Sequence, residues 1–102
     1  MKINHWGRVR QFIKKHPSAE KPLRLWKRSV IEAHWSNFSE VKQTFNSVDW
    51  FDGAIIFDIA GNNIRLIAVC RFDLGRLYID KVMTHEEYDN SNWKERYKKQ
   101  KH

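Results

Sequence analysis

The chain has 102 residues, a length that is enough for one domain. Its single cysteine excludes an internal disulfide and a cysteine-based zinc site. Hydrophobic residues make up 41% and aromatic residues 14% of the sequence, a composition typical of a folded globule. No apolar run is long enough to cross a bilayer, and the N-terminus lacks the apolar centre of a signal peptide, so we expect a cytoplasmic protein without a membrane partner.

The net charge of +7 is unevenly distributed along the chain. Residues 1–35 carry nine Lys and Arg against two Glu, and residues 93–102 carry five against one Glu. Residues 36–92 between them carry five Lys and Arg against nine Asp and Glu. Basic ends favour a polyanionic partner, most simply a nucleic acid, although a basic surface can also serve solubility alone.

Helical spacing of apolar residues begins close to the N-terminus. The apolar stripes in residues 6–16 and 18–35 predict two antiparallel helices that join through a tight turn at Pro17. Ser18 is the predicted N-cap of the second helix, and Pro22 falls in its first turn, where the missing N–H costs least.

The segments around this helical hairpin are shorter. Residues 1–4 are compatible with an edge strand. Apolar residues at helical spacing predict a third helix over residues 38–45, with Ser36 or Asn37 as its cap. Residues 46–53 are polar and turn-like.

The second half of the chain has the patterning of strands. Turn signals at Gly61-Asn62 and Asp73-Leu74-Gly75 separate three runs, which predict an antiparallel meander over residues 54–59, 63–72 and 76–83. Alternate residues of the middle run form a wholly apolar face that should pack on the helices. The opposite face carries Arg65 and Arg71 among apolar residues, which is unusual for an outer face.

These elements predict an α+β fold. The sheet is small and antiparallel-rich, with a three-stranded C-terminal meander plus an N-terminal strand, and two to three helices pack on one of its faces. We expect a domain over residues 1–92, followed by a basic C-terminal tail over residues 93–102.

The segment "KVMTHEEYDN", residues 81–90, concentrates polar side chains where the last strand ends. A metal site there is disfavoured because no second histidine accompanies His85. Acid–base chemistry is possible because one helical turn would place His85 beside Tyr88, next to the strand that carries Arg65. The alternative is a polar helix start with Tyr88 in the core and Arg65 in a cross-strand ion pair with Asp58 or Asp80. The residues alone leave the last two interpretations open.

Two stretches, "IIFDIAGNNIRLIAV" and "LYIDKVMTHEEYD", resemble the signature of HigB-type toxins in the RelE-like superfamily. Members typically read V-F-N-I-x-G-N-x-x-R-L and then Y-I-R-x-V-x-T-H-x-E-Y-D. The upstream helical half also resembles the family, and the similarity runs in order from about Met1 to Asp89.

The resemblance implies a RelE-like fold and the toxin of a type II toxin–antitoxin system. Such toxins are ribosome-dependent mRNA endoribonucleases, or mRNA interferases, that inhibit translation without a metal or other cofactor. The RNA 2′-hydroxyl attacks the adjacent phosphorus and leaves a cyclic phosphate or 3′-phosphate and a free 5′-hydroxyl. The implied partners are a HigA-like helix-turn-helix antitoxin, mRNA on the ribosome and ribosomal RNA, with operator DNA bound only through the antitoxin complex.

The resemblance also assigns roles to residues. Arg65 would hold the scissile phosphate, His85 would be the general base or acid, and Tyr88 would stack on a base or transfer a proton. The remaining basic residues expected to bind RNA are Arg71, Lys81, Lys94, Arg96, Lys98 and Lys99.

Three departures from the family pattern remove positive charge or add negative charge near the phosphate site. Asp80 replaces the usual arginine of Y-I-R, Asp58 replaces the usual asparagine of V-F-N-I, and residues 52–54 lack a usual basic residue. The alternative function is therefore a catalytically weakened RNA- or ribosome-binding module on the same fold. Direct DNA binding through the second helix is disfavoured, because its apolar residues are needed in the core.

Overall fold

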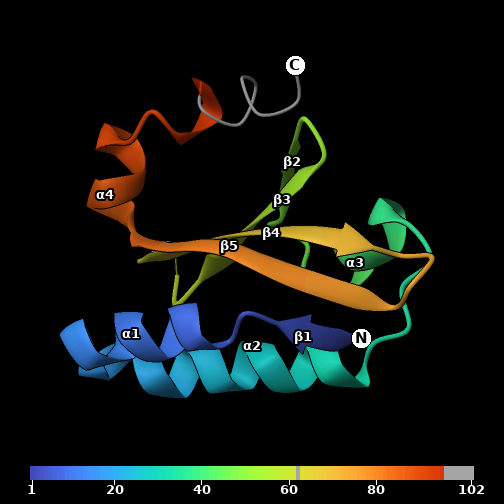
Figure 1. The fold of residues 1–102 in the computed structure, drawn as a ribbon, viewed down its shortest axis with the longest axis horizontal. Helices are drawn as coiled ribbons and strands as arrows, with labels where there is room; N and C mark the ends of the chain where they lie inside the picture. The colour runs from blue at the N-terminus through green and yellow to red at the C-terminus, as the bar shows by residue number, and fades with distance from the viewer. Residues whose placement is uncertain (62, 96–102) are drawn as a thin grey trace.

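The described residues of this computed structural model, 1–61 and 63–95, form one sheet with helices on both sides (Figure 1). The strand order is β1-β5-β4-β3-β2, with β1 parallel to β5 and every other neighbouring pair antiparallel. The strands span Lys2–Asn4 (β1), Asp49–Phe51 (β2), Ala54–Ile59 (β3), Ile64–Arg71 (β4) and Arg76–Thr84 (β5). The α+β class, the N-terminal edge strand and the C-terminal meander are thus confirmed.

Strand β2 is a correction to the sequence prediction, which treats residues 46–53 as a polar turn and leads to four strands instead of five. Asp49 lies opposite Ile56 and Phe51 lies opposite Ala54, so the segment pairs with β3. Asp52 and Gly53 join the two strands with φ angles of 51° and 90°. Left-handed φ at both central residues is typical of a type I′ hairpin turn, for which Asp-Gly is a favoured sequence.

Helices α1 and α2 lie antiparallel beneath one face of the sheet (Figure 1). They span Gly7–Lys15 and Glu20–Glu32, with the short 3-10 turn η1 over Pro17–Ala19 between them. Helix α2 ends three residues before the expected Trp35, because Ala33 already has an extended backbone. None of the helices in the described part of the chain is long and apolar enough to span a membrane.

The start of α2 also differs from the prediction. Ser18 is not its N-cap, because the helix begins at Glu20 after the cap residue Ala19 and no side chain accepts a cap hydrogen bond. The η1 turn occupies the junction, and its Ala19 N–H donates to the His16 carbonyl at 2.9 Å. Pro22 lies in the first turn of α2, as predicted.

The third predicted helix is α3, Phe38–Thr44. Asn37 is its N-cap, and the side-chain oxygen accepts a hydrogen bond from the Glu40 N–H at 3.0 Å. This confirms the predicted helix and one of its two candidate caps.

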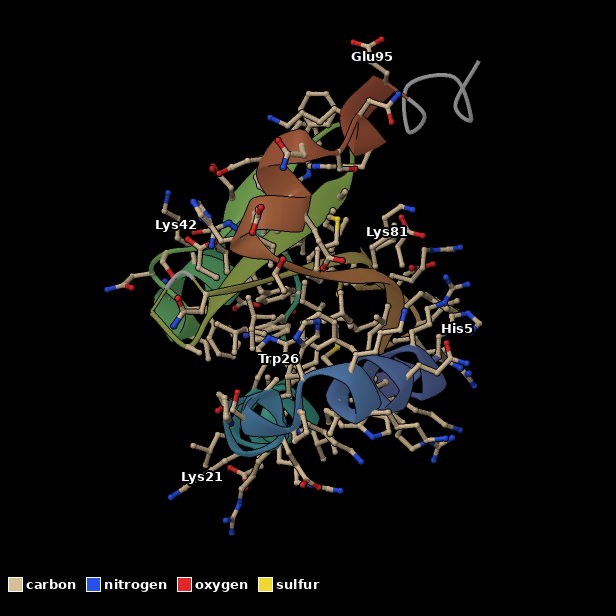
Figure 2. All side chains as sticks on the ribbon, turned by 90° about the vertical axis from the view of Figure 1, so that its left-hand side faces the viewer. His5, Lys21, Trp26, Lys42, Lys81 and Glu95 are labelled. Atoms are coloured by element: carbon tan, nitrogen blue, oxygen red, sulfur yellow. The ribbon has the colours of Figure 1, made fainter. Side chains whose placement is uncertain are left out.

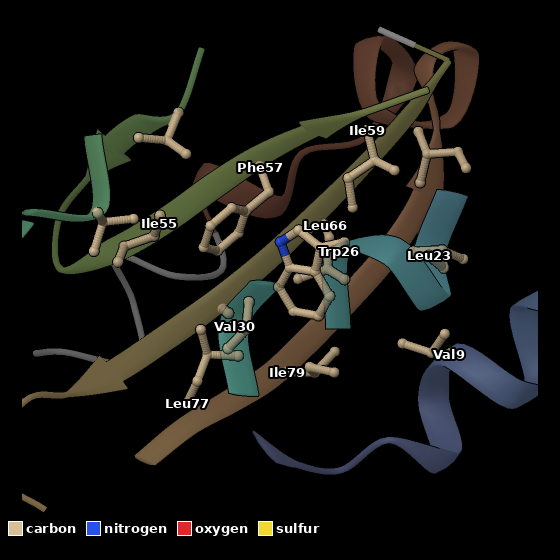
Figure 3. Close-up of a cluster of buried hydrophobic side chains, with 14 of the residues drawn as sticks. Val9, Leu23, Trp26, Val30, Ile55, Phe57, Ile59, Leu66, Leu77 and Ile79 are labelled. Atoms are coloured by element: carbon tan, nitrogen blue, oxygen red, sulfur yellow. The ribbon is translucent and has the colours of Figure 1, made fainter. Parts of the chain in front are cut away.

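The main hydrophobic core lies between the sheet and helices α1 and α2 (Figure 3). Trp26 of α2 packs edge-on against Phe57 of β3, with 5.2 Å between ring centroids. The predicted apolar face of β4 points into this core through Leu66 and Ala68, both fully buried. Other members are Val9, Phe12, Leu23, Val30, Ile55, Ile59, Leu77 and Ile79.

The opposite face of the sheet carries a second, smaller cluster of buried side chains. We call this face the second face; its buried cluster comprises Ala54, Ile56, Ile67, Met83 and Trp93, with Phe51 and Tyr88 packed against it. Helix α4, His85–Asn90, lies on this side of the sheet (Figure 1). Arg65 therefore lies on a partly covered surface and not on a solvated outer face.

Candidate active site where strands β4 and β5 meet helix α4

Helix α4 begins directly where β5 ends, and a capping box fixes its first turn. Thr84 Oγ1 accepts a hydrogen bond from the Glu87 N–H at 3.1 Å, and the Glu87 carboxylate accepts one from the Thr84 N–H at 2.9 Å. Thr84 is thus the N-cap of α4, and His85 is its first helical residue. The spacing T-x-x-E is the sequence signal for such a box. It sets the direction in which the helix presents His85 and Tyr88.

Arg65 is held from two sides. It lies directly opposite Asp58 in the β3–β4 ladder, and its Nε is 3.0 Å from Asp58 Oδ1. Its guanidinium also lies over the Tyr88 ring, with 5.3 Å from Cζ to the ring centroid. The Arg65 side chain is only 12% exposed, so water screens this ion pair less than a surface pair. Of the two cross-strand partners considered for Arg65, Asp58 is confirmed and Asp80 is not.

Tyr88 is half-buried between Arg65 and the Trp93 ring, whose centroid is 5.8 Å away. Burial raises the pKa of its phenol; Arg65 acts in the opposite direction, and Asp49, Asp58 and Asp89 raise it further. The sequence argument for Tyr88 as a proton acceptor needs a lowered pKa. The environment instead keeps the hydroxyl protonated, which makes Tyr88 a hydrogen-bond donor at neutral pH.

His85 is the first residue of α4, and its side chain is 52% exposed. Its Nε2 lies 3.1 Å from Asp89 Oδ2, one helical turn further on. Its backbone N–H donates to the carbonyl of Asn63 at 3.1 Å, which ties the start of α4 to the residue just before β4. The imidazole is therefore oriented by a carboxylate and reachable from solvent, two properties that suit a group exchanging protons.

These contacts bring the three predicted catalytic residues to one corner of the molecule. Arg65 supplies a fixed cation with planar N–H donors, Tyr88 a neutral hydroxyl donor, and His85 a carboxylate-oriented imidazole. Such a set can neutralise a phosphate and move protons around it. Within residues 1–61 and 63–95, no group of three or more His, Cys, Asp and Glu is placed to hold a metal ion.

Residues 19–91 match the family model described as HigB_toxin, the RelE-like toxic component of a toxin–antitoxin system. The chain belongs to the HigB toxin family. The mRNA interferase toxin HigB of Escherichia coli K12 is 31% identical over 78 residues, which cover 74% of this chain and 75% of that protein. The mRNA interferase HigB of Shigella flexneri matches equally well, and the one of Escherichia coli O6:H1 is 29% identical over 79 residues, covering 74% and 77% of the two chains.

The predicted RNA-binding residues that the structure describes, Arg71, Lys81 and Lys94, lie in different parts of this HigB toxin. Lys94 Nζ lies 5.0 Å from the centre of the Phe51 ring and 5.8 Å from the centre of the Trp93 ring, beside Tyr88. Arg71 is distant from the site, at the far end of β4, where its guanidinium pairs with Asp73 at 2.9 Å. That hydrogen bond raises the pKa of Arg71. Three further predicted residues lie outside the described part of the chain: Arg96, Lys98 and Lys99.

An irregularity in β5 places Lys81 on the same face of the sheet as Arg65. Ile67 lies opposite Lys81 and Ala68 opposite Ile79, so Asp80 is the extra residue of a β-bulge. The bulge reverses the alternation of side chains, and Lys81 then falls on the second face. Asp80, which replaces the arginine of the family pattern, accepts a hydrogen bond at its backbone carbonyl from Arg8 at 2.9 Å.

The residue that the sequence prediction missed is Trp93. It was placed at the start of the basic tail, yet it is 2% exposed and packs against Phe51 and Tyr88. A tryptophan in an otherwise polar, basic segment was the available signal, because so large an apolar surface is seldom left in water. The boundary between residues 92 and 93 stays a prediction.

The single cysteine has no contact with this corner. Cys70 is half-buried on the helix-facing side of β4, and burial raises the pKa of its thiol to about 11. A thiol with so high a pKa is a poor nucleophile at neutral pH.

Proposed function

We propose that this HigB toxin is an mRNA endoribonuclease that inhibits translation; its relatives in Escherichia coli and Shigella flexneri are named mRNA interferases. The observation that supports this most directly is the meeting of Arg65, Tyr88 and His85 where β4, β5 and α4 join. A cation, a neutral donor and an oriented imidazole suit the cleavage of a phosphodiester.

In the proposed reaction the 2′-oxygen of a ribose attacks the adjacent phosphorus, and the bond from phosphorus to the 5′-oxygen breaks. His85 takes the proton of the 2′-hydroxyl, and Asp89 stabilises the imidazolium that forms. Arg65 donates hydrogen bonds to the non-bridging phosphate oxygens as charge builds on them. The 5′-oxygen leaves with a proton donated by the Tyr88 hydroxyl or by water, and the His85 imidazolium returns its proton to the solvent, from which Tyr88 is reprotonated. The other product is a 2′,3′-cyclic phosphate.

Tyr88 acts in this scheme as a donor, because its raised pKa keeps the phenol protonated. Its hydroxyl donates a hydrogen bond to a phosphate oxygen or to the leaving 5′-oxygen, and its ring stacks under the Arg65 guanidinium. The reaction assigns no step to a metal ion. The nucleophile is a 2′-hydroxyl of the message, and Arg65 neutralises the charge on the phosphate.

The second candidate function is a catalytically weakened RNA- or ribosome-binding module. One observation favours it: Asp58 binds Arg65 at 3.0 Å and neutralises part of the charge that would meet the phosphate. An incoming phosphate must compete with this carboxylate for the guanidinium. Under this alternative the protein binds ribosomes with a steep salt dependence and leaves the message intact.

The partners follow from the family and from charge. A toxin of such a system has an antitoxin, and we propose a HigA-like helix-turn-helix protein that binds operator DNA in complex with the toxin. We also propose that cleavage takes place on the ribosome. Helices α1 and α2, which lie on the far side of the sheet from α4, offer ribosomal RNA the basic side chains Arg8, Arg10, Lys14, Lys15, Lys21, Arg24, Lys27 and Arg28.

The experiment compares growth and message integrity after expression of the chain alone. The unaltered chain should arrest growth, and primer extension in a translating extract should find new 5′ ends on ribosome-bound message. Arg65→Ala and His85→Ala should both restore growth and abolish the new ends. Lys42→Ala, on the exposed surface of α3, is the matched control and should remain toxic.

Thermal unfolding must accompany the Arg65 variant, because removing one partner of a largely buried ion pair destabilises the fold. Growth arrest without message cleavage would favour the binding module. Full toxicity in both site variants would overturn the site assignment.

A further inference from the structure

The second face of the sheet extends beyond the part that α4 and Trp93 cover. In the described residues, the buried cluster on this face reaches along β4 only as far as Ile67. The face then continues with Val69 and with Tyr78, which lies directly opposite it on β5, and both are half-buried. Tyr78 falls on this face because its neighbours Leu77 and Ile79 point into the main core.

A second ring stands beside Tyr78. His5 follows β1 with a left-handed φ of 70°, a conformation that non-glycine residues seldom adopt. This turn brings its exposed ring to 6.0 Å from the Tyr78 ring, measured between centroids, at an interplanar angle of 44°. Figure 2 shows His5 and Lys81 on the same side of the molecule.

Basic side chains flank these rings on the same face. Lys81 lies opposite Ile67, midway along the ladder between Arg65 and Tyr78, and Arg76 precedes Tyr78 by two residues on β5. Arg65 and Val69 are four residues apart on β4, which corresponds to about 13 Å along the strand. That distance is the span of a short piece of single-stranded RNA.

We propose that Tyr78 and His5, flanked by Lys81 and Arg76, form a subsite that stacks a base of the message to one side of the scissile phosphate. This inference rests on the proposed function. Single-stranded RNA is recognised largely by stacking of splayed bases on aromatic side chains, with cations along the backbone. The message would run from Arg65 past Lys81 to Tyr78, and the stacked base would fix which phosphate reaches Arg65.

The rings of Tyr78 and His5 fit stacking on a base better than recognition of a base through hydrogen bonds. Every base has an aromatic face, so an aromatic platform tolerates many sequences. The subsite should therefore contribute to the rate on most messages, and positioning should depend on the Tyr78 ring and not on its hydroxyl. Tyr78 is a positioning residue, because the chemistry itself takes place at Arg65 and His85.

The first test removes the ring of Tyr78 by a substitution that is compatible with strand β5. Tyr78→Val retains a β-branched residue, and Tyr78→Phe, which keeps the ring, is the matched control. On ribosomes carrying a defined message, Tyr78→Val should cleave about tenfold more slowly, and Tyr78→Phe should stay within about twofold of the unaltered chain. His5→Gly removes the second ring at a backbone position that glycine accepts, and should slow cleavage about threefold.

The same messages are then made with one abasic nucleotide at each position around the cleavage point. One abasic position should slow the unaltered chain about tenfold and leave Tyr78→Val unaffected, because the lost base and the lost ring are the two halves of one contact. The inference is overturned when no abasic position slows the unaltered chain while leaving Tyr78→Val unaffected. It is also overturned when the cleavage rate of Tyr78→Phe is as low as that of Tyr78→Val.

A second measurement needs no cleavage and so separates this inference from the proposed function. A message with 2-aminopurine at the sensitive position and a 2′-deoxynucleotide at the scissile position is bound to ribosomes. Stacking on Tyr78 should quench its fluorescence with the unaltered chain and with Tyr78→Phe, and not with Tyr78→Val. A loss of affinity of Tyr78→Val for ribosomes without message would instead place the ring on ribosomal RNA and overturn the message assignment.

Discussion

The guanidinium of Arg65 lies over the ring of Tyr88, with 5.3 Å between Cζ and the ring centroid, so a strand residue and a helix residue form one unit. Asp58 holds the same guanidinium from β3, and Trp93 supports the same ring. The proposed phosphate site thus depends on a carboxylate that competes with phosphate and on a tryptophan beyond the helix. Each dependence can be measured.

Replacing Asp58 by Asn should increase activity. The amide keeps the shape and can still accept a hydrogen bond from Arg65, but it no longer neutralises the guanidinium. We expect message cleavage to become faster, by up to about tenfold. Initial cleavage rates on ribosomes measure the effect, and Glu95→Gln, at an exposed side chain, is the control for the loss of one negative charge. A slower Asp58→Asn enzyme of unchanged stability would show that the carboxylate assists the reaction.

Tyr88→Phe separates the hydroxyl from the ring. The phenylalanine keeps the contacts with Arg65 and Trp93, so we expect a stable protein. Loss of the donor should lower the single-turnover cleavage rate by about one hundredfold and leave ribosome binding unchanged. Cleavage at the unaltered rate would restrict Tyr88 to stacking.

Trp93 should stabilise the second face of the sheet. A chain that ends at Glu95 keeps this side chain, whereas one that ends at Asn92 loses it. We expect the shorter chain to lose about 3 kcal/mol of unfolding free energy relative to the longer one. Urea denaturation provides the comparison, and Trp50→Ala, at a side chain that is 55% exposed, should cost about 0.5 kcal/mol or less. Equal stability of the two truncated chains would support the predicted boundary after residue 92.

Cys70 predicts a pH dependence of stability. Its thiol pKa is raised by burial from 9.0 to about 11, so the folded chain holds this proton more tightly than the unfolded chain does. Its contribution to stability is complete below pH 9 and is lost as the pH rises towards 11. Urea unfolding at several pH values between these limits should show a shallower decline for Cys70→Ala than for the unaltered chain. Parallel curves would mean that the thiol is not buried in solution.

Local patterns were sufficient to predict most elements of the fold. Turn signals delimit the runs of β3, β4 and β5, and helical spacing identifies α1, α2 and α3, because each of these helices needs one apolar face. The Asp52-Gly53 pair is itself a turn signal, and it marks the β2–β3 hairpin that the prediction of a polar turn over residues 46–53 leaves out. Ser18 failed as a cap because the backbone turn η1 already occupies that junction.

The sequence by itself determined which residue types could perform the proposed chemistry: Arg65, His85 and Tyr88 stand in motifs that resemble those of the HigB family. Only the tertiary structure decided what surrounds them. Pairing across β3 and β4 sets Asp58 against Arg65, and the bulge at Asp80 turns Lys81 onto the same face. Burial raises the pKa of the Tyr88 phenol, and the Tyr88 ring packs against Trp93. Contacts, desolvation and strand register depend on how the elements pack together, and the apolar pattern of a single segment leaves them open.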